Sequence, residues 1–137
     1  MANDLRLPVR RAIIAYLRTI PGVTALVGPT SIYGPEVPVG PVWPFVQYGF
    51  SNAFPDRASC LDGTRIVVSM HCYAHGPGED AASQVGNAIA RALDGAELKT
   101  EAGNDFSITW TGGTSLSDPG EPDAWHVTVD LDILASA

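Results

Sequence analysis

Apolar and polar residues alternate most regularly between residues 63 and 95, where the period of a strand gives way to the period of a helix. Every second residue is apolar through Thr64–Ala74, as in a strand with one face in a core. The breaker His75–Gly78 ends this strand, and apolar residues then recur at helical spacing through Glu79–Leu93. Small residues on that stripe, including Gly86, favour close packing against a sheet. The pattern predicts a strand, a tight turn and a helix that folds back over the strand's apolar face.

Five further segments have the pattern of a helix or a strand. An amphipathic helix is predicted from Pro8 to Ile20, because apolar residues recur there at helical spacing and arginines occupy the opposite side. The short apolar piece Val23–Val27 predicts one more helical turn. Period-two alternation predicts three more strands, at residues 45–50, 106–110 and 125–134.

The predicted order of elements is helix, strand, strand, helix, strand, strand. This order is typical of an α+β domain in which an antiparallel four-stranded sheet has two helices packed on one face. The length of 137 residues fits one domain, residues 1–137. Residues 29–44 contain five prolines and predict a stiff, extended arm that lies over the domain or reaches a neighbour, with Ile32 and Tyr33 as anchors. Residues 51–63 predict a long loop suited to contacts with partners.

Charge is unevenly distributed along the chain. The formal net charge is −7, yet the segment up to Arg18 has four arginines and a single acid. An acidic chain does not fit a protein that grips nucleic acid, because such binding needs Lys and Arg at the phosphates. No stretch approaches the roughly 20 apolar residues of a membrane span, and the N-terminal apolar run is too short for a signal peptide. We therefore expect neither membrane insertion nor export, and free thiols at Cys60 and Cys72.

Residue types with catalytic or metal-binding chemistry do not form a site in the sequence. His71 and His75 lie four residues apart on a strand, about 13 Å, which is too far for two ligands of one zinc ion. Cys72 belongs to the apolar face of its strand and is expected to act as a small hydrophobe. Asp130 and Asp132 share one side of the last strand, where carboxylates are more often solvated than catalytic. We expect no catalytic residue, no cofactor and no metal, and a protein that is not an enzyme.

Several short motifs occur in a defined order along nearly the whole chain. They are Ile32-Tyr33, Trp43-Pro44-Phe45-Val46, the strand from Arg65 to Tyr73, the helix from Gly78 to Leu93, and Asp118-Pro119 followed by His126. Each motif is unspecific by itself, but their order resembles the tail-completion or tail-terminator family of long-tailed, siphovirus-type bacteriophages, prophages and gene transfer agents. The length of the proline-rich arm, the loop at 51–63 and the high acidity depart from that family's pattern.

The resemblance implies a structural virion protein that forms a ring, usually a hexamer, at the head-proximal end of the tail tube. Such a ring stops tube polymerisation and joins the tail to the neck, so its implied partners are further copies of the chain, the major tail tube protein and a neck or head-closure protein. Double-stranded DNA would pass through the lumen without sequence-specific binding. The implied location is the virion tail, after assembly in the cytoplasm of a bacterial host.

Charged and aromatic residues of the arms and loops are the candidates for subunit or partner contacts. A negative lumen would keep DNA phosphates from sticking, and acids can also meet the arginines of an adjoining subunit. The expected contact residues are Arg10, Arg11, Arg18, Tyr33, Phe54, Asp118, Glu121 and Asp123, and the expected lumen-facing residues are Asp130 and Asp132.

Two other classes of function stay open from the sequence. A different neck component, such as a head-closure, stopper or adaptor protein, is also small, acidic and ring-forming. A more distant alternative is a small thiol-dependent or histidine-dependent hydrolase that uses Cys72 or His126.

Overall fold

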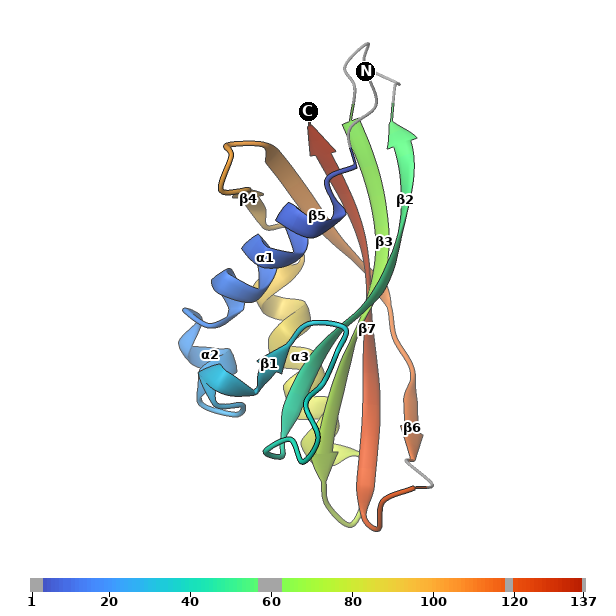
Figure 1. Ribbon diagram of the computed structural model, residues 1–137. Helices are drawn as coiled ribbons and strands as arrows, with labels where there is room; N and C mark the ends of the chain where they lie inside the picture. Colours follow the sequence, from blue (N-terminus) through green and yellow to red (C-terminus); the bar gives the residue numbers. More distant parts are fainter. Residues whose placement is uncertain (1–3, 57–62, 118–119, 137) are drawn as a thin grey trace.

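The protein is a mixed α+β fold in which helices lie on one face of a strongly twisted sheet (Figure 1). The computed structural model describes residues 4–56, 63–117 and 120–136. The elements are α1 (Arg6–Leu17), α2 (Pro21–Thr24), the 3₁₀ turn η1 (Pro29–Ser31), β1 (Ile32–Tyr33), β2 (Phe45–Asp56), β3 (Gly63–His75), α3 (Asp80–Leu93), β4 (Glu97–Lys99), β5 (Asp105–Gly112), β6 (Ser115–Ser117) and β7 (Ala124–Ser136).

Three long strands, β2, β3 and β7, form the centre of the sheet. The strand order is β1-β2-β3-β7-β5-β4, and β6 also pairs with β7. Strands β3 and β7 are antiparallel over their whole length, from Gly63 opposite Ser136 to His75 opposite Ala124. Strand β1 pairs with β2 in parallel, and the other pairs are antiparallel. The ends of the long strands extend beyond the helices (Figure 1).

The predicted four-stranded antiparallel sheet is wrong in both size and direction. The described residues form a seven-stranded mixed sheet, because three segments expected to be irregular add the short strands β1, β4 and β6. Each has only two or three residues, which is too short to show a period in the sequence. The predicted loop 51–63 is also wrong in its first part, since β2 continues to Asp56 against β3. Residues 57–62 lie outside the described residues.

The two predicted main helices are present on one face of the sheet. Helix α1 buries Val9, Ile13 and Leu17, and α3 buries a stripe that includes Ile89 and Leu93. Helix α1 begins and ends earlier than the predicted range from Pro8 to Ile20, and the one-turn helix α2 begins at Pro21. Among the described residues, no helix has the length and hydropathy needed to cross a membrane.

The core forms between the helices and the alternate residues of β3, as the period-two pattern predicts. Ile66, Val68, Met70 and Cys72 are all buried on the helix side. Helix α3 approaches β7 closely at Gly86, where a Cβ atom would lie 2.8 Å from Cγ1 of Val127. That distance is shorter than a van der Waals contact, so the sheet accommodates glycine here and no larger residue without a shift.

Candidate assembly surfaces

In the part of the chain that the structure describes, the sheet face opposite α1 and α3 has no helix over it (Figure 1). The side chains on this face alternate with the core residues of β3 and β7, and they are mainly polar or charged. The strand register aligns them in rows, with Ser69 beside Asp130 and Val67 beside Asp132. This uncovered face carries both residues that were expected to line a lumen.

Each of the two aspartates on the uncovered face has a partner within its own chain. Arg65 donates from Nε to Oδ1 of Asp132 and from Nη2 to Oδ2, both at 3.0 Å. The hydroxyl of Ser69 donates to Oδ1 of Asp130 at 2.6 Å. Hydrogen bonding to Asp132 raises the pKa of Arg65. The charge of Asp132 is thus largely offset by Arg65, whereas Asp130 accepts from a neutral group.

Aromatic and histidine side chains stack on the same face at the end where β2 begins. Tyr73 lies between Phe45, with ring centroids 4.7 Å apart, and His126, at 4.4 Å. Nδ1 of His71 and Nε2 of His126 are 2.6 Å apart and share a hydrogen bond. Burial lowers the pKa of His71, and the charge of Asp130 partly opposes this effect. The stacking holds β2, β3 and β7 together on the side away from the core.

The position of Cys72 does not fit the hydrolase alternative. The side chain is fully buried on the helix side of β3, and burial raises the pKa of its thiol to about 12. A catalytic cysteine needs an accessible thiolate, so Cys72 has the wrong environment for a nucleophile. His126 lies on the opposite face and stacks on Tyr73. Within the described ranges, no three His, Cys, Asp or Glu residues are grouped closely enough to hold a metal ion.

Helix α1 and the residue that caps its C-terminus, Arg18, carry the three arginines expected at subunit contacts, and their environments differ. Arg11 is exposed beside a groove of about 550 Å³ between α1 and β4. Arg10 is half-buried and lies near the buried ring of Tyr48. Arg18 donates from Nη2 to the carbonyl oxygen of Ile32 at 3.0 Å, so it supports β1 within its own chain.

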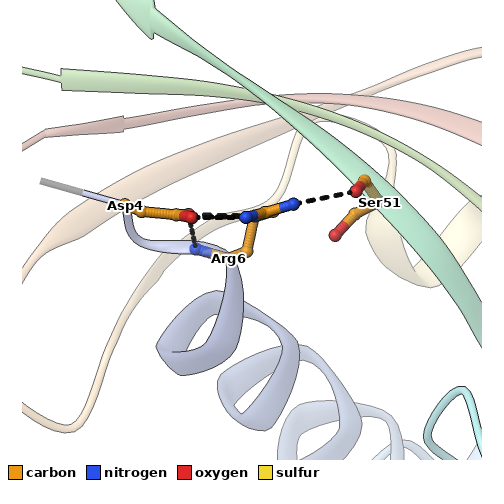
Figure 2. Close-up of polar contacts among 3 residues, drawn as sticks. All are labelled: Asp4, Arg6 and Ser51. Carbon is orange, nitrogen blue, oxygen red and sulfur yellow. Dashed lines mark hydrogen bonds and ion pairs between the residues drawn. The ribbon is translucent and has the colours of Figure 1, made fainter.

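The start of α1 is fixed to β2 by an arginine that the sequence analysis did not single out. Figure 2 shows Arg6 between Asp4 and Ser51: its Nη2 donates to Oδ2 of Asp4 at 2.6 Å and its Nη1 to the carbonyl oxygen of Ser51 at 3.4 Å. Hydrogen bonds from Arg6 lower the pKa of Asp4. These contacts leave Arg10 and Arg11 as the cations of α1 that have no ion pair among the described residues.

The acidic contact candidates lie at one end of the molecule, before β7. Glu121 and Asp123 are exposed, and Oε1 of Glu121 is 3.8 Å from Nε2 of His75. Asp123 has φ 56°, and its carbonyl oxygen accepts a 2.8 Å hydrogen bond from the amide of Gly76. The turn before β7 is therefore tied to the turn after β3. Asp118 lies outside the described residues.

The two aromatic contact candidates have different environments. Tyr33 is half-buried in β1 and packs on its own Phe45, with ring centroids 5.9 Å apart. Phe54 is 49% exposed on β2 and stands opposite Arg65 on the uncovered face. Of the two, Phe54 is therefore the side chain that is available to a partner.

Sequence reasoning missed a third aromatic residue, Phe50, which is 85% exposed. A β-bulge between Tyr48 and Ser51 breaks the regular register with β3 and turns Phe50 out of the sheet. The neighbouring Gly49 is the local signal that could have revealed the bulge, because a glycine inside a strand often marks one. An added Cβ at Gly49 would overlap the carbonyl oxygen of Ser69.

The sequence profile of the tail completion protein gp17 family matches residues 11–136. The chain belongs to this family. A chain from the virion of a native gene transfer agent particle has the same fold, with a TM-score of 0.81 and 18% sequence identity over 94% of this chain and 95% of that one. A second solved structure, which carries no functional description, has a TM-score of 0.55 and 15% identity over 96% of this chain and 95% of that one. No curated protein has significant sequence similarity to the chain.

As a member of the tail completion protein gp17 family, the chain is a tail-associated structural protein of a virion. This membership confirms the resemblance seen in the order of the sequence motifs. The surfaces described above are therefore candidates for subunit contacts, because a structural virion protein acts through its contacts with other subunits. In this tail completion protein, exposed basic residues lie on α1 and exposed acids lie before β7, on separate elements of the same chain.

Proposed function

We propose that the protein is a tail terminator, which forms a ring, most simply a hexamer, at the head-proximal end of the tail tube. The ring stops polymerisation of the tube and joins the tail to the neck. The observation that carries this proposal is the match of the tail completion family over residues 11–136. The shared fold with a chain of a gene transfer agent virion supports it.

The separation of charges on the surface supports a head-to-tail contact between copies. Two different patches on one subunit that complement each other generate a ring when the rotation between subunits closes. Here the basic patch is the exposed Arg11 on α1, with the half-buried Arg10 next to it in the chain, and the acidic patch is Glu121 and Asp123 before β7. The acidic patch of one copy then meets the basic face of α1 on the next copy.

The uncovered sheet face is the proposed lining of the lumen. Asp130 lies there, and Arg65 offsets the charge of Asp132, so the lining is weakly negative and not basic. The whole chain has a net charge of −7. Double-stranded DNA would be repelled by such a lining and would slide through without being held, because tight binding requires cations at the phosphates.

The partners that follow are the major tail tube protein on one side of the ring and a neck or head-closure protein on the other. The protein would reach this position in the virion during assembly in the cytoplasm of the host. Tube growth stops because the ring covers the surface on which the next layer of tube subunits would bind.

Particles assembled without the gene test this proposal directly. A terminator predicts tubes that grow well beyond the normal length, visible by electron microscopy. Free tails of normal length together with heads that have lost their DNA would contradict termination, and they would instead indicate a head-closure component.

A further inference from the structure

The proline-rich arm contacts the rest of the domain at Pro35 and at Trp43, on either side of its middle segment. On one side, Nε2 of Gln47 donates to the carbonyl oxygen of Pro35 at 2.7 Å. On the other side, the ring of Trp43 packs on Phe45, at 4.9 Å between centroids, and on His75, at 4.1 Å. Residues 36–42 between these contacts are here called the arm tip.

The arm tip exposes apolar side chains that no other part of the described chain covers. Val39 is fully exposed, at 105% of the reference area, and Val42 is 70% exposed. Gly40 turns the chain with φ 70°, and prolines recur at every third position from Pro35 to Pro44. A loop stiffened in this way loses little conformational entropy when it binds, so its exposed valines are presented in a form suited to docking.

A groove between α1 and β4 has a lining that suits a proline-rich apolar segment. This α1–β4 groove has a volume of about 550 Å³, which lies in the range of pockets that hold a ligand. Its lining is Pro8, Arg11, Ala12, Ala15, Tyr16, Thr19, Leu98, Lys99, Thr100 and Glu101. An aromatic ring beside small apolar residues is the kind of surface on which proline-rich segments dock.

One charge contact is available between the arm tip and the groove, whose lining carries Arg11, Lys99 and Glu101. Glu36 is the one charged residue of the arm tip, it is exposed, and it has no ion pair among the described residues. Arg11 at the groove is likewise exposed and has no ion pair within the described ranges. Lys99 is already 2.9 Å from Asp105, so Arg11 is the cation available to Glu36.

The arm tip and the acidic turn before β7 lie at the same end of the molecule, since His75 contacts both Trp43 and Glu121 (Figure 1). We propose that the arm tip of one copy docks into the α1–β4 groove of the next copy, with Val39 and Val42 in the groove and Glu36 beside Arg11. The occupant is a second copy of this chain, because the tip and the groove are complementary patches on different sides of one subunit. The inference rests on the proposed ring and identifies the contact that closes it.

Disulfide cross-linking in purified tails tests the docking. Val39→Cys and Ala15→Cys are combined in a Cys60→Ser background, in which Cys72 stays buried. Oxidation is expected to produce a ladder of covalent oligomers that ends at the size of the ring, and each single variant should give no ladder. A ring without any ladder would overturn the docking, as would a cross-link from Val39→Cys to a different virion protein.

Substitutions at the surface give a second test with matched controls. Val39→Asp should weaken ring formation about tenfold or more, because it places a charge against the apolar residues of the groove, such as Ala12 and Ala15. Leu134→Asp, at a 48% exposed position on the opposite sheet face, should not weaken it. Glu36→Arg and Arg11→Glu should each weaken the ring, and the double variant should recover part of the loss, since Arg11 also belongs to the basic patch proposed to meet Glu121 and Asp123; no recovery at all would overturn the pairing of Glu36 with Arg11.

The docking and the termination function can fail separately. Normal rings and normal tube lengths with Val39→Asp would overturn the docking and leave termination standing. If the double-cysteine variant gives a covalent ladder, but particles made without the gene have tubes of normal length, the docking stands and termination is overturned.

Discussion

Tyr48 is a core residue whose ring packs favourably but whose buried hydroxyl destabilises the fold. The residue is 1% exposed, and its hydroxyl is the buried side-chain polar atom without a hydrogen-bond partner among the described residues. Burial raises the pKa of Tyr48, so the group stays neutral throughout the physiological range. A buried hydroxyl without a partner costs about 1–3 kcal/mol, which the burial of the ring must outweigh.

Replacing Tyr48 with phenylalanine should therefore stabilise the protein. We expect Tyr48→Phe to raise the free energy of unfolding in urea by about 1 kcal/mol, since it removes the unsatisfied group and keeps the ring. Tyr16→Phe is the matched control, because Tyr16 is only half-buried and should show no gain. A loss of stability in Tyr48→Phe would mean that the hydroxyl does have a stabilising partner.

His71 should make stability depend on pH. Its pKa in the folded state is lowered by burial, so the unfolded chain binds the proton more readily. Stability is then full above the unfolded value of about 6.5 and falls as the pH drops below it, until the folded protein is protonated too.

The measurement for His71 is urea unfolding between pH 7.5 and the acid limit of solubility. His71→Gln should flatten the loss of stability on acidification, because the glutamine side chain does not titrate. An unchanged slope in His71→Gln would show that His71 does not govern the acid response.

The distance between α3 and the sheet depends on a contact between two elements, at Gly86 of α3 and Val127 of β7. Alanine is favoured over glycine within a helix by about 1 kcal/mol, but its Cβ would lie 2.8 Å from Val127. We expect Gly86→Ala to destabilise the protein by about 1 kcal/mol, because overpacking outweighs the gain in propensity. In a Val127→Ala background the same substitution should become stabilising, and thermal unfolding of the four variants measures the reversal. If the sign does not reverse, contact with Val127 does not set the spacing.

The long, regular elements are predicted well from the sequence and the short ones poorly. Strand β3 and helix α3 lie within one residue of their predicted ends, because a period maintained over 11 or more residues is a strong signal. Strands β1, β4 and β6 depend on a neighbouring strand for their hydrogen bonds, and no local pattern reveals them. The polar continuation of β2 through Ser51 and Asn52 escapes prediction for the same reason, since it is held by β3.

The sequence predicts the charge of the candidate surfaces, but not which of their side chains are paired within the chain. Composition indicates a basic helix and acidic loops, and both exist. The ion pair between Arg65 and Asp132 spans 67 positions in sequence, so it follows only from the register of β3 and β7. Likewise, the sequence does not distinguish Arg11 from Arg18, which donates a hydrogen bond to the carbonyl oxygen of Ile32 in its own chain.

During assembly, the opposite charges of α1 and the acidic turn should govern how copies associate. Reversing Arg10 and Arg11 to glutamate is expected to weaken ring formation at low salt, and the difference from the unmodified protein should shrink as salt screens the contact. Arg91→Glu, an exposed change on α3, is the control. Sedimentation velocity at several salt concentrations measures the association. If the Arg10/Arg11 variant and Arg91→Glu associate equally, the pairing of α1 with the acidic turn before β7 is excluded.

The proposed function requires that this chain ends the growth of a polymer. The most direct measurement is the length of tubes that purified tail tube protein forms with and without the chain, seen by electron microscopy. We expect added protein to halt elongation and to appear as a ring at one end of each tube. Tubes of equal length in both reactions, with no copy of the chain at either end, would contradict termination.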